Sequence, residues 1–264
     1  DSALGRQRRL NSVGESVLQI APSAAAAYSL RSLTGGDPKV VRVRRDTDNA
    51  EQDFTASGVS SGALVDFATS GNGVFANTGY ESFTNASASG FTASNTGSTG
   101  FAVSDILDGV SGDAISVSFD IYITNGSPSI SLRTALDGGS TASNSVVYTS
   151  SGSKTATLTG TKGYVGIGFT EGDAPSNFTV SNFKVLGNGF VDTWYDQSGN
   201  GNDAEQATAG NQPKIVSSGS LVADSGIDFD GSQFLQADSV SGMGATVSTI
   251  VTSVHDSGGG GCVS

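Results

Sequence analysis

The stretch Ala114-Ile-Ser-Val-Ser-Phe-Asp-Ile-Tyr-Ile-Thr124 decides the fold of this chain. Its hydrophobic side chains alternate with polar ones over the whole length. Because neighbouring side chains of a β-strand point to opposite faces, the alternation predicts a strand with one face in a core and the other in water. Similar short runs occur at 130–136 and 165–169, between turns rich in Gly, Asn and Ser. Strands of this length, with turn signals roughly every eight to twelve residues, predict an all-β sandwich or jelly roll.

The alternation slips once, in the run from Asn177 to Val185. Phe178 and Val180 are out of step with Phe183 and Val185. One extra residue in the strand would let Phe183 and Val185 point to the same face as Phe178 and Val180, so we predict a β-bulge at Ser181–Asn182.

The first part of the chain carries a different pattern. Pro22, Ala24–Ala27, Leu30 and Leu33 predict a short N-terminal helix over residues 22–33, because proline suits the first turn and alanine favours helix. Gly35-Gly36 would end this helix. The run Lys39–Arg45 then alternates valine with arginine and predicts a half-buried strand. We expect Arg42, Arg44 and Arg45 to form salt bridges within the chain or between subunits, rather than a ligand site.

Composition excludes several classes of function. The chain has 264 residues, a formal net charge of −12, one histidine and one cysteine, His255 and Cys262. It therefore has no intrachain disulfide framework and no metal site built on several His or Cys residues. Most of the negative charge follows residue 45, and such a body repels nucleic acid. No run of 18 apolar residues occurs, so we expect no membrane insertion.

Residues 194–202, Trp-Tyr-Asp-Gln-Ser-Gly-Asn-Gly-Asn, resemble a motif in the catalytic domain of arabinofuranosidase B enzymes, which have a concanavalin A-like sandwich. Residues 21–33 and 40–48 resemble the opening helix and strand of that family. The run Phe229–Leu235 resembles laminin G-like lectin domains. Taken together, the chain most closely resembles bacteriophage virion proteins, of tail fibres or capsid decorations, that share this lectin-like fold.

The resemblance implies a domain organisation. Residues 1–20 would be an N-terminal anchor segment. Residues 21–67 plus 188–264 would form a discontinuous, partial concanavalin A-like domain, which we expect to be truncated at its C-terminus. Residues 68–187 would be an inserted jelly-roll domain, because their last predicted strand resembles the closing strand of a carbohydrate-binding module. Insertion at an exposed loop is tolerated when the ends of the insert lie close together.

The resemblance also implies a function. We expect a virion structural and adhesion protein, located on the virion or outside cells. Arg6, Arg8 and Arg9 would dock it on other virion proteins, although short basic segments are often simply solvated. Further copies of the chain and host-surface glycans are the other expected partners. The alternatives are a fragment of a secreted arabinofuranosidase-type glycoside hydrolase and a bacterial surface protein with lectin-like modules.

Catalysis receives little support from the residues themselves. A glycosidase needs two carboxyl groups on either side of the scissile bond. Glu205 is the only glutamate after Trp194, and neither catalytic residue of the arabinofuranosidase family can be matched to a position in this chain. We therefore predict no enzyme activity and no catalytic residue in residues 1–264.

Four residues are candidates for binding carbohydrate: Tyr122, Asp120, Trp194 and Tyr195. The alternation places Tyr122 on the polar face of its strand beside Asp120, although tyrosines are also common on sheet surfaces without a ligand. Trp194 and Tyr195 are adjacent and so face opposite sides of a strand. One of the two rings is therefore expected to pack in the core.

The turn Asp196–Asp203 is dense in oxygen donors and glycine, and two interpretations are open. Asp196, Asn200 and Asn202 could bind Ca²⁺, which prefers carboxylate and carbonyl oxygens, and Ca²⁺ is the one cofactor considered. Alternatively, Asp196 and Asn200 tie the loop to its own backbone while Gly199 and Gly201 take positive φ angles.

Overall fold

The structure is a computed structural model that describes residues 18, 24–70, 73–95, 100–106, 114–135, 144–159, 163–169, 176–222, 226–237 and 240. The regular elements of these residues are almost all β-strands, with the short helices α2 (Ala56–Ser60) and α3 (Ala63–Ala68) and the 3-10 turn η1 (Ala209–Asn211). The predicted all-β, sandwich-type fold class is confirmed. No helix in this described part is long and apolar enough to cross a membrane.

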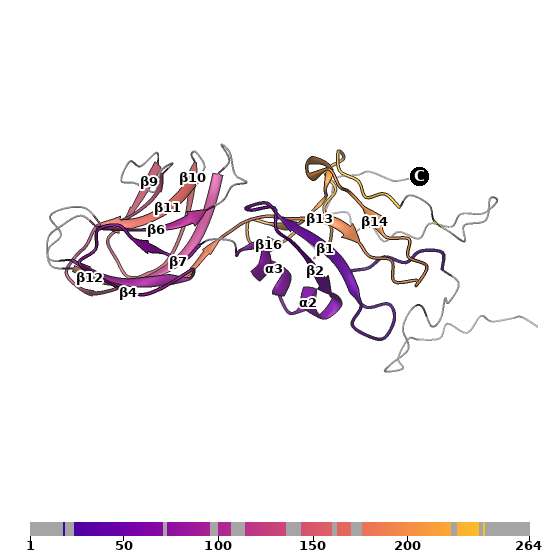
Figure 1. Ribbon diagram of the computed structural model, residues 1–264, viewed down its shortest axis with the longest axis horizontal. Coiled ribbons are helices and arrows are strands. Elements are labelled where there is room, and N and C mark those ends of the chain that lie inside the picture. Colours follow the sequence, from indigo (N-terminus) through magenta and orange to yellow (C-terminus); the bar gives the residue numbers. More distant parts are fainter. Residues whose placement is uncertain are drawn as a thin grey trace, which may run out of the picture.

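One sheet gathers strands from both sides of the middle of the chain. Its order is β16-β15-β13-β1-β2, with β14 beside β13, and every pairing is antiparallel. The strands are β1 (Lys39–Arg45), β2 (Glu51–Thr55), β13 (Gly189–Trp194), β14 (Ala204–Glu205), β15 (Lys214–Ser217) and β16 (Ser220–Leu221). Helices α2 and α3 cover one face of this sheet (Figure 1), where Val59 and Leu64 pack against Val41, Val43 and Val191.

The middle of the chain forms a sandwich of two five-stranded antiparallel sheets, ordered β10-β7-β12-β5-β4 and β3-β6-β11-β8-β9. Their bounds are β3 (Ala76–Asn77), β4 (Ser82–Ser87), β5 (Gly90–Asn95), β6 (Gly100–Ile106), β7 (Ala114–Asn125), β8 (Ile130–Ala135), β9 (Asn144–Tyr148), β10 (Gly152–Thr159), β11 (Gly163–Phe169) and β12 (Ser176–Val185). A single core joins the two sheets, with Phe119 and Phe178 from one and Leu132 and Ile167 from the other.

The two patterns read most closely from the sequence are confirmed. In β7, Val117, Phe119 and Ile121 are buried, while Tyr122 lies on the opposite, solvent-facing side. In β12 the register against β7 shifts between Ser181 and Lys184, and Asn182 has a φ of 52°. The predicted bulge therefore exists, and it allows the residues before and after it to point into the same core.

The chain leaves the first sheet after α3 and returns to it immediately beside that point. A Cβ atom on Gly187 would lie 2.6 Å from the carbonyl oxygen of Ala68, so only glycine fits here. The Asp46 carboxylate accepts hydrogen bonds from the backbone N–H of Asn188 at 3.0 Å and from its side-chain amide at 2.7 Å. Burial raises the pKa of Asp46 despite these bonds. The contact brings the two ends of the middle segment together, while the exact domain boundaries stay a prediction.

The predicted N-terminal helix over residues 22–33 is wrong where the structure describes it, because residues 24–33 run without helical structure. Main-chain groups of Ala24, Ala25 and Ala27 bind a distant loop instead. Helix propensity contributes only tenths of a kcal/mol per residue, so hydrogen bonds that satisfy the same groups elsewhere override it.

Two of the three arginines of β1 form the expected salt bridges within the chain, and Arg44 makes hydrogen bonds to uncharged groups instead. Arg42 pairs with Glu51 at 3.1 Å and Arg45 pairs with Asp48 at 2.6 Å. Arg44 hydrogen-bonds the side-chain oxygen of Gln212 at 2.7 Å.

Candidate functional site

Residues 24–33, which we call the strap, are held by the loop Asp196–Asp203, which we call the clamp loop. Gln197 of this loop is 6% exposed. Its Nε2 donates to the carbonyl oxygens of Ser29 and Arg31, both at 2.9 Å, and its Oε1 accepts from the N–H of Leu33 at 2.7 Å. Its backbone N–H donates to Ala27 O at 2.8 Å. One buried residue thus satisfies four main-chain groups of the strap.

Both carboxylate oxygens of Asp196 accept hydrogen bonds from N–H and O–H groups of the protein. Oδ1 accepts from the N–H groups of Ala27 and Ser198, both at 2.8 Å. Oδ2 accepts from Ser198 Oγ at 2.7 Å and from the N–H of Asn202 at 3.1 Å. Burial of Asp196 opposes its ionisation, but these hydrogen bonds hold its pKa below the ordinary value. A carboxylate has about four acceptor positions, so none is left for a cation.

The two asparagines of the clamp loop also face the strap. Asn200 Nδ2 donates to the carbonyl oxygens of Ala24 and Ala25 at 2.9 and 3.0 Å, and Asn202 Nδ2 donates to Ala25 O at 2.7 Å. Gly199 and Gly201 have φ angles of 86° and 72°.

The three residues predicted to bind Ca²⁺ are therefore together, but the carboxylate of Asp196 is occupied by N–H and O–H groups, and the side-chain amides of Asn200 and Asn202 bind the strap. Over the described residues, no group of three or more His, Cys, Asp or Glu is arranged for a metal. This donor set does not fit Ca²⁺, which needs free oxygen ligands. The geometry matches the second interpretation, a hydrogen-bonded turn, with the addition that the turn binds another segment.

Trp194 and Tyr195 lie on opposite sides of their strand, as their adjacency predicts. The Trp194 ring packs against the core of the first sheet, and its centroid is 5.5 Å from that of Tyr28 in the strap. Within the described chain, the buried Trp194 Nε1 has no hydrogen-bond partner. The Tyr195 hydroxyl donates to Asp53 Oδ1 at 2.7 Å. Both rings thus make internal contacts, and neither lines the pocket described below, while their role in sugar binding stays a prediction.

The Tyr195–Asp53 bond gives a pH-dependent signal. Burial, and then the bond to Asp53, raise the pKa of Tyr195 to about 12. We expect Asp53→Asn to lower this pKa toward the ordinary value of about 10. The pKa of Tyr195 is measured from tyrosinate absorbance as a function of pH. The titration of Tyr195→Phe is subtracted from that of the wild type, and the titration of the double variant Asp53→Asn/Tyr195→Phe from that of Asp53→Asn. Because the folded pKa is raised, the neutral tyrosine stabilises the fold below pH ~10, and this contribution disappears as pH rises through the folded pKa. An unchanged titration would contradict the assignment.

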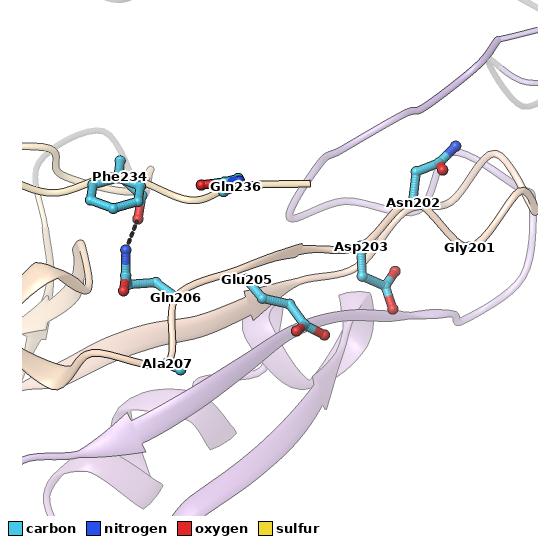
Figure 2. Close-up of a pocket in the computed structure, with 8 residues that line it drawn as sticks. All are labelled: Gly201, Asn202, Asp203, Glu205, Gln206, Ala207, Phe234 and Gln236. Atoms are coloured by element: carbon cyan, nitrogen blue, oxygen red, sulfur yellow. Dashed lines mark hydrogen bonds between the residues drawn. The ribbon is translucent and has the colours of Figure 1, made fainter. Parts of the chain in front are cut away.

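A pocket of about 510 Å³ lies beside the clamp loop (Figure 2). It is lined by Gly201, Asn202, Asp203, Glu205, Gln206, Ala207, Phe234 and Gln236. Backbone hydrogen bonds of 2.9 and 3.0 Å pair Glu205 with Gln236, and Gln206 Nε2 donates to Phe234 O at 3.3 Å. The carboxylates of Asp203 and Glu205 point to the same side in Figure 2. The Phe234 side chain is 47% exposed.

Sequence reasoning found only part of this pocket. It singled out Asn202 as a metal ligand and considered Glu205 only as a possible catalytic carboxylate, which could not be matched to the arabinofuranosidase family. Phe234 lies in the run that resembles lectin domains, which was the one available signal for it. Gln236 gave no signal, because its pairing with Glu205 is an isolated bridge outside the regular strands.

Tyr122 and Asp120 lie on the outer face of the sandwich, on a different sheet from the pocket. Tyr122 is 64% exposed and stands in register with Thr179 of β12. Asp120 accepts a hydrogen bond from Asn182 Nδ2 at 2.7 Å, and the bonds from Ser153 and Asn182 lower its pKa. The predicted placement of Tyr122 beside Asp120 on the polar face is confirmed. Arg6, Arg8 and Arg9, predicted to dock the chain, lie outside the described residues, as do His255 and Cys262.

No protein-family model and no curated protein matches the chain. Among solved structures, it is similar to the family 11 carbohydrate-binding module of the cellulosomal cellulase Lic26A-Cel5E of Clostridium thermocellum. The identity is 18%, the match covers 45% of this chain and 84% of that one, and the TM-score is 0.26. A family 11 module from Clostridium thermocellum in complex with a β-1,3-1,4-mixed-linked tetrasaccharide gives 16% identity, 45% and 85% coverage and a TM-score of 0.26. A TM-score this low establishes neither the fold nor the function of this chain. The fold is defined by the sheets described above, and the candidate site by the contacts of its own residues.

Proposed function

We propose that this chain is a glycan-binding adhesion protein and that the pocket beside the clamp loop takes a sugar residue. The observation that carries the proposal is the combination of polar groups and an exposed ring around one pocket. Asp203 and Glu205 accept hydrogen bonds from sugar hydroxyls, and the side-chain amide of Gln236 both donates and accepts them. Phe234 supplies an apolar face on which a sugar ring stacks. A few polar groups beside an apolar surface are typical of small-ligand sites.

The charge of the pocket narrows the class of sugar. Asp203 and Glu205 are both carboxylates, and no basic side chain lines the pocket among the residues that the structure describes. Like charges brought together cost free energy on binding. The proposal is therefore a neutral sugar or an amino sugar, rather than a uronic or sialic acid.

The test is calorimetric titration of the full chain with neutral, amino and acidic oligosaccharides. We expect Phe234→Ala to weaken binding of a neutral or amino sugar at least about tenfold, which is about 1.4 kcal/mol. Phe229→Ala is the matched control, because Phe229 is also exposed but does not line the pocket. The proposal fails if no neutral or amino sugar binds, or if Phe234→Ala binds as well as Phe229→Ala.

Tyr122 and Asp120 support a second sugar contact, on the outer face of the sandwich. An exposed tyrosine offers a stacking surface, and the neighbouring carboxylate offers an acceptor. Tyr122→Ala would then weaken attachment to a glycan-coated surface while leaving titration of the pocket with a short oligosaccharide unchanged. Two weak contacts on one chain also raise the overall strength of attachment when both are engaged.

The finer proposal is that the chain is displayed in many copies on a phage particle, where its N-terminal region, with Arg6, Arg8 and Arg9, docks on other virion proteins. The support is the sequence resemblance to tail-fibre and capsid-decorating proteins. Many weak sugar contacts per particle would add up to firm attachment. Electron microscopy of particles labelled through this chain tests the setting. Replacing the three arginines by alanine should reduce incorporation into particles.

An arabinofuranosidase-type glycoside hydrolase is the second candidate, and one observation favours it. Asp203 and Glu205 line one pocket and point to the same side, and glycosidases use two carboxyl groups. Release of arabinose from arabinan by the wild-type chain, lost in both Asp203→Asn and Glu205→Gln, would support the hydrolase. Binding without release supports the adhesion protein.

A further inference from the structure

The strap reaches the wall of the pocket through Tyr28. The Tyr28 hydroxyl donates a hydrogen bond to the carbonyl oxygen of Asn202, and Asn202 Nδ2 returns one to Ala25 O at 2.7 Å. Asn202 is buried and lines the pocket (Figure 2). The backbone carbonyl and the side-chain amide of this pocket residue are therefore both bound to the strap.

Asp196 makes a second connection to the same wall. Its Oδ1 accepts from the N–H of Ala27 in the strap at 2.8 Å, while its Oδ2 accepts from the N–H of Asn202 at 3.1 Å. The backbone N–H of Asp196 donates to the carboxylate oxygen Oδ1 of Asp203 at 2.8 Å. One residue therefore contacts the strap and both of the polar pocket residues in the clamp loop.

We propose that Tyr28 and Asp196 are positioning residues, and that the seated strap holds Asn202 and Asp203 in the arrangement that binds sugar. This inference rests on the proposed role of the pocket. If the strap leaves, Asn202 loses its bonds to Tyr28 and Ala25, and Asp196 loses the bond from Ala27.

The physical reason is preorganisation. Fixing a free side chain costs about 0.5–1.5 kcal/mol at the moment of binding, and a side chain that is already fixed avoids this cost. Gly199 and Gly201 lie in the same loop, so its backbone has other conformations to adopt when the strap is absent. A tyrosine hydroxyl titrates near pH ~10 and is a donor at neutral pH, and burial and the nearby carboxylates of Asp196 and Asp203 raise the pKa of Tyr28 further.

The coupling is reciprocal, because any factor by which the strap strengthens sugar binding is the factor by which sugar strengthens seating of the strap. A bound sugar should therefore slow hydrogen exchange at the amides of Ala27 and Leu33, which donate to the clamp loop. A residue that only supports the fold would not produce this ligand-dependent protection.

The experiment compares Tyr28→Phe with Tyr195→Phe in the full chain. Both changes remove one hydroxyl, but that of Tyr195 bonds Asp53 on β2 rather than the clamp loop. Seating of the strap is read from the fluorescence of Trp194, the only tryptophan of the chain, and from hydrogen exchange. We expect Tyr28→Phe to weaken sugar binding about threefold to tenfold and to reduce the sugar-dependent protection of the strap. Tyr195→Phe should change neither.

Two results would overturn the inference. Wild-type sugar affinity in Tyr28→Phe, together with faster strap exchange, would leave the proposed function standing but show no coupling. If the wild-type chain binds no sugar at all, the proposed function fails, and the positioning role is then judged by the amide chemical shifts of Asn202 and Asp203. Those shifts should move in Tyr28→Phe and not in Tyr195→Phe, and the absence of any movement would refute the role.

Discussion

Gln197→Leu is expected to lower the free energy of unfolding by about 2–4 kcal/mol, because it removes three hydrogen bonds that each contribute about 0.5–1.5 kcal/mol. The side-chain amide of Gln197 serves two carbonyl groups and one N–H of the strap, and leucine has a similar size but no polar atom. The strap should separate from the clamp loop, because its main-chain groups then gain more from water. Urea unfolding followed by the fluorescence of Trp194 measures the change, because this ring packs against Tyr28 of the strap.

The matched control for this change is Gln52→Leu. Gln52 lies on β2 with its side chain exposed, so the same chemical substitution should alter the stability by no more than about 0.5 kcal/mol. Hydrogen exchange at Leu33 should rise in Gln197→Leu and stay unchanged in Gln52→Leu. Equal stabilities of the two variants would contradict the role given to Gln197.

Arg45→Met is expected to lower the free energy of unfolding by about 3 kcal/mol, because hydrogen bonds to charged groups contribute about 1.5–3 kcal/mol each. The Arg45 guanidinium donates to both carboxylate oxygens of Asp48, at 2.9 and 2.6 Å, to Phe67 O at 2.8 Å and to Ser70 Oγ. It also lies 4.7 Å from the centre of the Phe67 ring. It therefore ties the β1–β2 turn to the end of α3.

Arg42→Met on the same strand is the control. The Arg42 side chain is 41% exposed, against 10% for Arg45, and its ion pair with Glu51 is on the surface. Exposed pairs contribute at most about 1 kcal/mol. Arg45→Lys keeps the charge but not the planar fork, so it should recover only part of the loss. A loss in Arg42→Met as large as that in Arg45→Met would sink the argument.

The effect of Arg45 should also depend on pH, with a defined sign. The hydrogen bond from Arg45, against some opposing burial, lowers the pKa of Asp48. A lowered folded pKa adds stability above the unfolded value of about 3.9, and this stability is lost as pH falls through the folded pKa. The difference between wild type and Arg45→Met is therefore largest near neutral pH and shrinks in acid.

The features that the sequence predicted well are those set by local geometry. The alternation in residues 114–124 is enough to place Tyr122 outside and Phe119 inside, and a slip in the same period is enough to locate the bulge at Ser181–Asn182.

The features that escaped are those set by contacts between distant segments. The alanines of the strap favour helix locally, but Asp196, Gln197 and Asn200 bind their main-chain groups from across the fold. A clamp that contacts carbonyl and N–H groups leaves no pattern in the side chains of the strap. The pocket is hidden for a similar reason, because Glu205 meets Gln236 through an isolated bridge rather than a long regular strand.

The close approach of Gly187 to Ala68 has a consequence for how such a chain changes over time. The segment between these two positions therefore begins and ends at the same place on the first sheet. A change in the length or sequence of this segment leaves the pairing of β1 with β13 intact, provided that position 187 stays glycine. The middle segment can therefore be replaced as a unit, while the clamp loop and its pocket keep their structure.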